Sequence, residues 1–208
     1  MNFDNFLHKL PILKTKKLGG LQAQFKLAPK MRLQYDAEAI TQKKPNKAGV
    51  LALFYPNKLQ ETCILLTQRA SYKGTHFNQI SFPGGKVNNA DKNIEITALR
   101  ETFEEVGVPS SEIKIIREIT DVYIPPSNFL ATPFIGFMHK NPLFNTNYEV
   151  AEIIEIPISN LLNNNNISSI NVTTSYTKNT NVPCFKFNNR IIWGATAMIL
   201  SEIKELLK

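Results

Sequence analysis

Cysteine is scarce in this sequence, with only Cys63 and Cys184 among 208 residues. Their spacing matches neither a zinc site nor a disulfide framework. Cys63 lies within a strand-like apolar run, so we expect a buried free thiol at that position. A structural zinc module and a disulfide-stabilised small domain are therefore excluded as ways of holding this chain together.

Long hydrophobic runs are also missing. No segment reaches the roughly 18 consecutive apolar residues that a membrane-spanning helix needs. The first residues, Met1 to Phe6, contain no basic region followed by an apolar stretch, so they do not resemble a secretory signal peptide. The sequence has no internal repeats either. We therefore expect a cytoplasmic protein that has no membrane partner.

Acidic residues are outnumbered, because 17 Asp and Glu face 24 Lys and Arg, giving a net charge of +7. A basic surface attracts polyanions. No stretch combines basic and aromatic residues as nucleic-acid-binding modules do, so we do not expect nucleic acid as a partner. A phosphate-rich small molecule would explain the charge equally well. The 13 Phe and a hydrophobic content of 43% are sufficient for the packed core of one domain.

The most informative stretch runs from Gly84 to Val108 and combines a glycine turn with an amphipathic helix. Asp91 or Asn93 can cap the start of this helix, and Gly107 suits the left-handed residue that follows a last turn. Weakly polar or apolar residues recur along it at steps of three and four, namely Ile94, Ala98, Leu99, Thr102 and Val106. The pattern predicts a helix with one buried face.

Three glutamates of this helix are neighbours in space. Glu101, Glu104 and Glu105 are related by steps of three and four, so their carboxylates project close together. Like charges repel, and the helix dipole disfavours anions in the last turn. A divalent cation that prefers oxygen ligands, Mg²⁺ or Mn²⁺, would hold such a cluster together. The alternative is a solvated acidic face, which is common on Glu-rich helices.

The string from Arg100 to Val108, Arg-Glu-x-x-Glu-Glu-x-Gly followed by an aliphatic residue, resembles the signature of the Nudix hydrolases. Thr102 departs from the pattern, which has an aliphatic residue at that position. The upstream acid of the signature falls on Asp91 when counted forward from Gly85, but on Lys92 when counted back from Arg100. The loop is thus one residue longer than the general pattern, as it is in the coenzyme A pyrophosphatase branch.

A second block is similar to the motif that precedes the Nudix signature in coenzyme A pyrophosphatases. It comprises Leu65 to Ser71, His76, Gln79 and Phe82 to Gly85. The chain departs from that motif at Lys73, Gly74 and Asn78. The resemblance implies hydrolysis of the diphosphate bond of coenzyme A or its derivatives to 3′,5′-ADP and 4′-phosphopantetheine or its acyl form. Alternatives are another pyrophosphatase substrate such as ADP-ribose, or a catalytically silent module that binds a ligand or RNA.

The resemblance also implies roles for individual residues. Glu101 and Glu105 would bind the metal ion, Glu104 would share this role or orient the attacking water, and the carbonyl of Gly85 would be a further ligand. We expect Arg100 to orient the glutamates by ion pairing. The general base remains open between a helix glutamate such as Glu104 and a later one. Candidates for the later position are Glu149, which we favour, and its rivals Glu152 and Glu155.

Substrate contacts are expected around the glycine turn. Arg69 and Lys86 are cations placed to meet phosphate groups, while His76 and Gln79 would contact a 3′-phosphate or the phosphopantetheine amide. Ser127 and Asn128 could hydrogen-bond the substrate, although Asn128 is equally suited to forming a turn. A further aromatic residue, Trp193, is expected in the core rather than as a stacking platform for a base.

The remaining pattern predicts an α/β fold, which the resemblance specifies as an α/β/α sandwich with a mixed central sheet and one catalytic loop-helix-loop. Residues 1–45 would form a helical and extended segment packed on the Nudix domain of residues 46–208 and, by analogy, a homodimer contact. A hairpin is expected from Val172 to Phe187, turning at Lys178 to Asn181. A closing helix is expected from Ile191 to Leu207.

Overall fold

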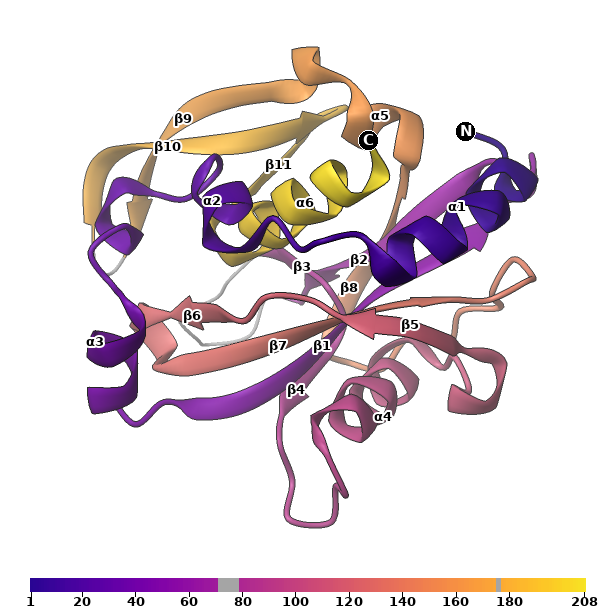
Figure 1. Ribbon diagram of the computed structural model, residues 1–208, viewed down its shortest axis with the longest axis horizontal. Coiled ribbons are helices and arrows are strands. Elements are labelled where there is room, and N and C mark those ends of the chain that lie inside the picture. The colour runs from indigo at the N-terminus through magenta and orange to yellow at the C-terminus, as the bar shows by residue number, and fades with distance from the viewer. Residues whose placement is uncertain (71–78, 175–176) are drawn as a thin grey trace.

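The structure is a computed structural model that describes residues 1–70, 79–174 and 177–208 (Figure 1). Within these residues an eight-stranded sheet runs in the order β3-β2-β1-β7-β5, with β4 paired to β1, β6 to β7 and β8 to β2. Its strands are β1 Asn46–Pro56, β2 Thr62–Arg69, β3 Ile80–Ser81, β4 Gly84–Lys86, β5 Lys114–Glu118, β6 Val122–Ile124, β7 Phe129–Phe137 and β8 Val150–Pro157. Strands β1 and β7 are parallel and the other pairs are antiparallel, so the sheet is mixed, as predicted.

Helices cover both faces of this sheet. On one face lies α4 (Ile94–Val106), and on the other lie α1 (Phe3–Thr15), α2 (Gly20–Phe25) and α6 (Gly194–Leu207) (Figure 1). Alternate residues of β1 serve the two cores: Leu51 and Leu53 pack in the cluster that includes α4, whereas Ala52 and Phe54 pack in the one that includes α1 and α6. This explains why β1 reads as an unbroken apolar run. The α/β/α arrangement confirms the predicted fold class.

A second sheet, with order β11-β10-β9, lies beyond α6 from the first. It consists of β9 Ile167–Thr174, β10 Thr177–Phe187 and β11 Arg190–Trp193. The hairpin prediction was therefore correct, but its turn was wrong, because Lys178 to Asn181 lie inside β10. The closing helix begins at Gly194, three residues later than predicted. Ile191 pairs with Lys186 across a tight turn at Asn188, which has a φ of 52°, and this pairing keeps residues 190–193 in a strand.

The N-terminal residues pack on the rest of the chain. Phe3, Phe6 and Leu13 of α1 are buried in the same core as α6. Helix α1 extends to Thr15 with Pro11 inside it. The remaining short elements are α3 Ala37–Gln42, α5 Ile158–Leu162, and the 3₁₀ turns η1 Lys30–Arg32, η2 Ser110–Glu112, η3 Pro125–Ser127 and η4 Asn164–Asn166. In the described residues, no helix is long and apolar enough to cross a membrane.

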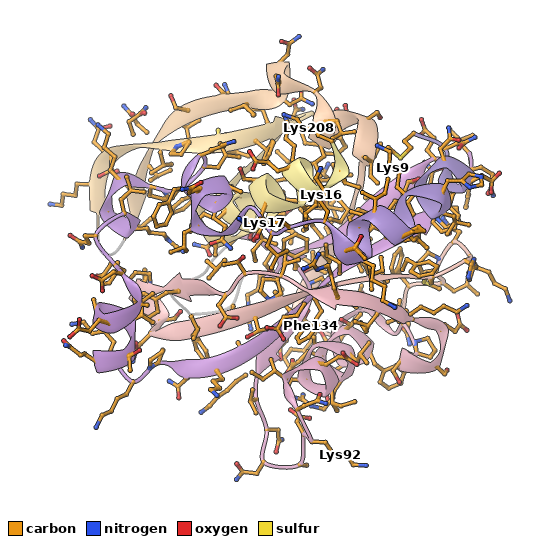
Figure 2. The ribbon with its side chains drawn as sticks, in the orientation of Figure 1. Lys9, Lys16, Lys17, Lys92, Phe134 and Lys208 are labelled. Carbon is orange, nitrogen blue, oxygen red and sulfur yellow. The ribbon has the colours of Figure 1, made fainter. Side chains whose placement is uncertain are left out.

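Lysines gather around the C-terminal end of α6 (Figure 2). Lys9 Nζ donates to the carbonyl of Leu207 at 2.9 Å, and Lys16 Nζ donates to that of Glu205 at the same distance. The last carbonyls of a helix lack partners within it and carry partial negative charge, so cations stabilise them. Part of the excess of basic residues therefore has a structural role.

Candidate active site

Helix α4 begins and ends as its sequence indicates. Of the two candidates for its cap, Asn93 is the one used, because its side chain accepts a hydrogen bond from the backbone N–H of Ile96 at 2.9 Å. Gly107 follows the last turn with a φ of 75°, a left-handed conformation that costs glycine little. The buried face consists of Thr97, Ala98, Leu99, Thr102 and Val106. Glu101 and Glu105 lie half-buried at the edge of this face, where they meet the glycine turn, whereas Glu104 is exposed.

The glycine turn touches two of these glutamates. The backbone N–H of Gly84 donates to Glu105 Oε2 at 3.2 Å. A β-carbon added at Gly85 would lie 2.4 Å from the carboxyl carbon of Glu101 and 2.6 Å from both of its oxygens. Only glycine therefore lets strand β4 come this close to Glu101. The two carboxylates lie one helical turn apart against the same backbone segment.

Arg100 connects the glutamates to the loop before the helix. Its Nη1 donates to Glu101 Oε1 at 2.8 Å and to Glu104 Oε2 at 3.0 Å. Its Nε and Nη2 donate to the two oxygens of Asp91 at 3.0 and 2.9 Å, and Nη2 also donates to the carbonyl of Lys86 at 3.2 Å. Asp91 is thus the acid that meets the arginine, despite the longer loop. Hydrogen bonds from Arg100 and from the Asn88 N–H hold the pKa of Asp91 well below its usual range.

The two glutamates at the turn are hard to ionise. Burial raises the pKa of Glu105 to about 7, and the negative charges of Glu101 and Glu149 raise it further. The hydrogen bond from the Gly84 N–H and the charge of Arg69 act in the opposite direction. Burial also raises the pKa of Glu101, although Arg100 opposes this shift. Both shifts express a cost of placing neighbouring anions where water is partly excluded. A bound cation would remove that cost.

The donor set fits a magnesium-type ion. Among the described residues, no three or more His, Cys, Asp or Glu side chains form a group that could hold a metal ion. Glu101 and Glu105 instead offer two carboxylates at a cavity. Mg²⁺ is commonly held by one or two carboxylates, with water and substrate phosphates completing its shell, rather than by an all-protein cage. This pair is therefore suited to an ion that arrives with a phosphate-containing ligand.

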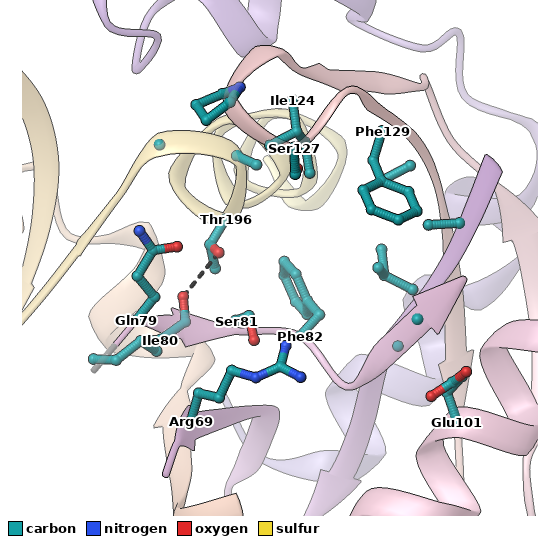
Figure 3. A pocket seen from close by; sticks show the side chains of 18 of the residues that line it. Arg69, Gln79, Ile80, Ser81, Phe82, Glu101, Ile124, Ser127, Phe129 and Thr196 are labelled. Atoms are coloured by element: carbon teal, nitrogen blue, oxygen red, sulfur yellow. Dashed lines mark hydrogen bonds between the residues drawn. The ribbon is translucent and has the colours of Figure 1, made fainter. Parts of the chain in front are cut away.

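A cavity of about 560 Å³ opens beside these carboxylates. Figure 3 shows Glu101 at one side of it, Arg69 below, and the rings of Phe82 and Phe129 facing the space between the main sheet and α6. Most of the predicted site residues line this cavity, namely Arg69, Gln79, Gly85, Lys86, Glu101, Glu105, Ser127 and Glu149. Acidic, basic and apolar surfaces therefore meet in one space.

Among the described residues, three of the predicted ones lie outside the cavity lining: Arg100, Glu104 and Asn128. Glu104 is half-exposed and bonded to Arg100. Asn128 adopts a left-handed conformation, accepts a hydrogen bond from the Tyr123 hydroxyl and donates to the carbonyl of Lys43, so its amide shapes a turn rather than facing the cavity. His76 lies outside the residues that the structure describes.

Glu149 is the later glutamate that reaches the cavity. Its carboxylate accepts a hydrogen bond from Arg69 Nη2 at 2.8 Å, and both side chains line the space that Glu105 lines. Its rivals do not: Glu152 pairs with Arg190, and Glu155 lines a separate cavity. The three candidates for the later glutamate therefore differ in position, a difference that the sequence alone could not reveal.

Sequence reasoning missed several cavity residues. Trp193 is half-buried and lines the cavity, which corrects the expectation that it belongs to the core. Arg32 also lines it, although it lies far from the glycine turn in sequence. No local pattern around Arg32 signals this position, but the stretch Ala23-Gln24 lies shortly before it in the sequence. That stretch is anchored to α6, because Ser201 Oγ donates to the carbonyl of Ala23 at 2.7 Å.

Paired carboxylates on a helix after a glycine turn, facing a cavity with basic and apolar walls, define a class of metal-assisted phosphoanhydride hydrolases. Residues 45–152 match the model of the NUDIX domain. The chain is also 32% identical over 146 residues to proteins of Yersinia pestis and Yersinia pseudotuberculosis, each named "Uncharacterized Nudix hydrolase NudL", covering 70% of this chain and 72% of each relative. The chain belongs to the Nudix hydrolase family, which acts on phosphorus-containing anhydrides.

Solved structures share the fold. A MutT/nudix family protein from Enterococcus faecalis superposes with a TM-score of 0.54 at 17% identity, covering 85% of this chain and 71% of that one. The NUDIX domain of Shewanella oneidensis NrtR, crystallised with ADP ribose, gives a TM-score of 0.51 at 15% identity and covers 85% of this chain and 96% of its own. At such identities the likeness concerns the fold.

Proposed function

We propose that this protein hydrolyses the diphosphate bond of coenzyme A or an acyl derivative in the presence of Mg²⁺ or Mn²⁺. The observation that carries the proposal is the contact of both Glu101 and Glu105 with the Gly84-Gly85 turn at the edge of a mixed polar and apolar cavity. The block from Leu65 to Gly85, with its resemblance to coenzyme A pyrophosphatases, supports the substrate. The products would be 3′,5′-ADP and 4′-phosphopantetheine or its acyl form.

In this proposal Glu101 and Glu105 hold the divalent ion, with the Gly85 carbonyl as a further ligand. The ion, when bound, neutralises charge on the diphosphate. Arg100 is a positioning residue, because it bonds both Asp91 and Glu101 and so fixes the carboxylate of Glu101. Glu104 supports the same arrangement through Arg100. The cost of burying Glu101 and Glu105 side by side as anions is offset when the divalent ion binds between them and the phosphates.

Glu149 is the proposed general base. It would take one proton from a water molecule as the water oxygen bonds to a phosphorus atom and the bridging P–O bond breaks. Arg69, bonded to Glu149 in the structure, would turn to the diphosphate when the substrate binds, since a guanidinium pairs well with phosphate oxygens. Lys86 and Ser127 line the same cavity and would contact the phosphate-rich end of the substrate.

The first experiment is product analysis by chromatography and mass spectrometry. Purified protein with Mg²⁺ or Mn²⁺ would receive coenzyme A, acetyl-coenzyme A, ADP-ribose and diadenosine polyphosphates in one mixture. We expect 3′,5′-ADP to appear first and EDTA to abolish it. If ADP-ribose or a dinucleotide is consumed first, a Nudix hydrolase with another substrate replaces our proposal. If nothing is cut, a silent binding module does.

A matched pair of variants tests the site itself. Glu105→Gln removes one charge at the glycine turn and should abolish turnover. Glu95→Gln makes the same change in the first turn of the same helix, away from the cavity lining, and should retain it. Full turnover by a folded Glu105→Gln protein would contradict the assignment of the metal site.

A further inference from the structure

A second cavity, of about 280 Å³, adjoins the active site. One wall comes from the N-terminal segment after α2, with Pro29, Met31 and Tyr35, and the facing wall comes from the second sheet, with Val172 of β9 and Val182 of β10. Three further residues line both this cavity and the catalytic one, namely Arg32, Pro126 and Trp193. The two spaces therefore meet at a shared boundary.

The walls of the second cavity are mainly apolar. Pro29 and Val182 are buried, and the ring of Tyr35 packs edge-on against Tyr123 at 5.2 Å between ring centres. Arg32 is the only charged residue among the described residues that line it, and it stands at the boundary with the catalytic cavity. A ligand group that lies deep in this space gains by leaving water only if it is apolar.

We propose that the second cavity binds the acyl chain of an acyl-coenzyme A substrate whose diphosphate lies at Glu101 and Glu105. This inference rests on the proposed function and narrows it to acyl thioesters. The occupant follows from charge: the 3′-phosphorylated nucleotide end of coenzyme A needs cations, and the described lining of the catalytic cavity supplies Arg69 and Lys86 near the glycine turn. The thioester end is uncharged and suits the apolar space beyond Trp193.

The N-terminal segment holds the boundary in place. Gln24 Nε2 donates to the carbonyl of Thr120 at 2.8 Å and to the buried carboxylate of Glu202 on α6 at 3.0 Å. Eight residues further along, Arg32 Nη1 donates to the carbonyl of Tyr123 at 3.0 Å. These bonds tie the segment to α6 and β6, so Pro29 and Met31 form a fixed wall. The anchoring stretch thereby acquires a role in substrate selection.

The single tryptophan of the chain gives a direct binding test. Trp193 lines both cavities, so a bromine atom at the end of a bound acyl chain would quench its fluorescence on contact. The probe is 8-bromooctanoyl-coenzyme A, added with Mg²⁺ to the Glu149→Gln variant so that turnover is slow, with octanoyl-coenzyme A as the unbrominated control. We expect saturable quenching by the brominated chain alone. No quenching beyond the control would overturn the proposal.

A matched pair of variants locates the chain. Val172→Phe fills the second cavity, whereas Thr173→Phe adds the same bulk to the next residue of β9, which points to the other face of the strand and is exposed. Each methylene kept out of an apolar site costs roughly fourfold in affinity. We therefore expect Val172→Phe to lower the ratio of kcat/KM for octanoyl-coenzyme A to that for coenzyme A at least tenfold, and to remove the quenching.

Thr173→Phe should preserve both the ratio and the quenching. If Val172→Phe leaves the ratio unchanged, or if quenching persists in it, the acyl chain lies elsewhere and the inference is wrong. Failure of the proposed function looks different: neither coenzyme A nor any acyl derivative would be cleaved with Mg²⁺ or Mn²⁺ by the unmodified protein. Hydrolysis of coenzyme A with no effect of chain length would overturn only the acyl site.

Discussion

Arg100 and Asp91 form a two-point ion pair in which Nε and Nη2 of the guanidinium meet the two carboxylate oxygens at 3.0 and 2.9 Å. The side chain of Asp91 is only 3% exposed. The same guanidinium bonds Glu101, so the loop before α4 is coupled to the proposed metal ligand through a single side chain. The pair predicts how the stability of the fold responds when Asp91 changes.

Asp91→Asn should destabilise the fold by about 1 to 2 kcal/mol at pH 7, because it weakens charged hydrogen bonds to Arg100, which keeps its bonds to Glu101 and Glu104. The folded pKa of Asp91 is depressed, so its stabilisation is fully present above the unfolded pKa, about 3.9, and is lost as pH falls through the folded value. The difference between variant and wild type should therefore shrink below pH 4. Urea unfolding at pH 7 and pH 3 measures this.

Lys92→Asn provides the comparison for that experiment, since Lys92 is the neighbouring residue and is exposed. An exposed substitution of this kind usually changes stability by less than about 0.5 kcal/mol. A loss in Lys92→Asn as large as that in Asp91→Asn would mean that the loop, and not the ion pair, is responsible.

Gly85→Ala should weaken metal binding without unfolding the protein. The new methyl group would lie 2.4 Å from the Glu101 carboxyl carbon, and this group sits at the end of a flexible side chain that can move away. We expect Mn²⁺ affinity, measured by calorimetry, to fall at least tenfold, while the free energy of unfolding changes by less than about 1 kcal/mol.

Gly107→Ala should do the opposite: it should destabilise the fold without weakening metal binding. Its φ of 75° disfavours any side chain, and the added β-carbon would lie 2.9 Å from the backbone carbonyl oxygen of Asn145. We expect a loss of about 1 to 2 kcal/mol in stability, with Mn²⁺ affinity retained in the folded protein. Equal effects of the two variants on Mn²⁺ affinity would contradict a specific role for Gly85.

Glu149→Gln should lower kcat by about 10²- to 10⁴-fold, the usual contribution of a general base. Glu152→Gln, on the same strand but paired with Arg190 outside the cavity, should remain close to wild type. If Glu104→Gln instead shows the larger loss in kcat, the base belongs to α4.

Gln24→Ala tests the proposal that residues 1–45 form an extension packed on the Nudix domain. It would leave the buried Glu202 carboxylate without one of its donors, a change that typically costs about 1 to 3 kcal/mol. Gln22→Ala alters an exposed residue of the same helix and should cost much less. Equal thermal stability of the two variants would show that the Gln24 contacts contribute little.

The sequence by itself determined helix α4, the glycine that ends it and most of the strands, because these depend on short-range periodicity and on residues a few positions apart. Gly85, Gly107, the spacing of the glutamates and the apolar run of β1 are all signals that can be read from residues close together in the sequence. The same local signals misplaced the start of α6, because Ile191 to Trp193 gain more by pairing with β10 than by extending the helix.

Only the tertiary structure decided which side chains share the cavity. Asp91 rather than Lys92 meets Arg100 because of the path of the loop. Glu149 rather than Glu152 lines the cavity with Glu105, because Glu149 directly precedes Val150, which pairs with Arg69 at the end of β2. Arg32 and Trp193 come from segments near opposite ends of the chain and meet there because α6 holds both. Such contacts depend on long-range packing, which no local pattern of residues encodes.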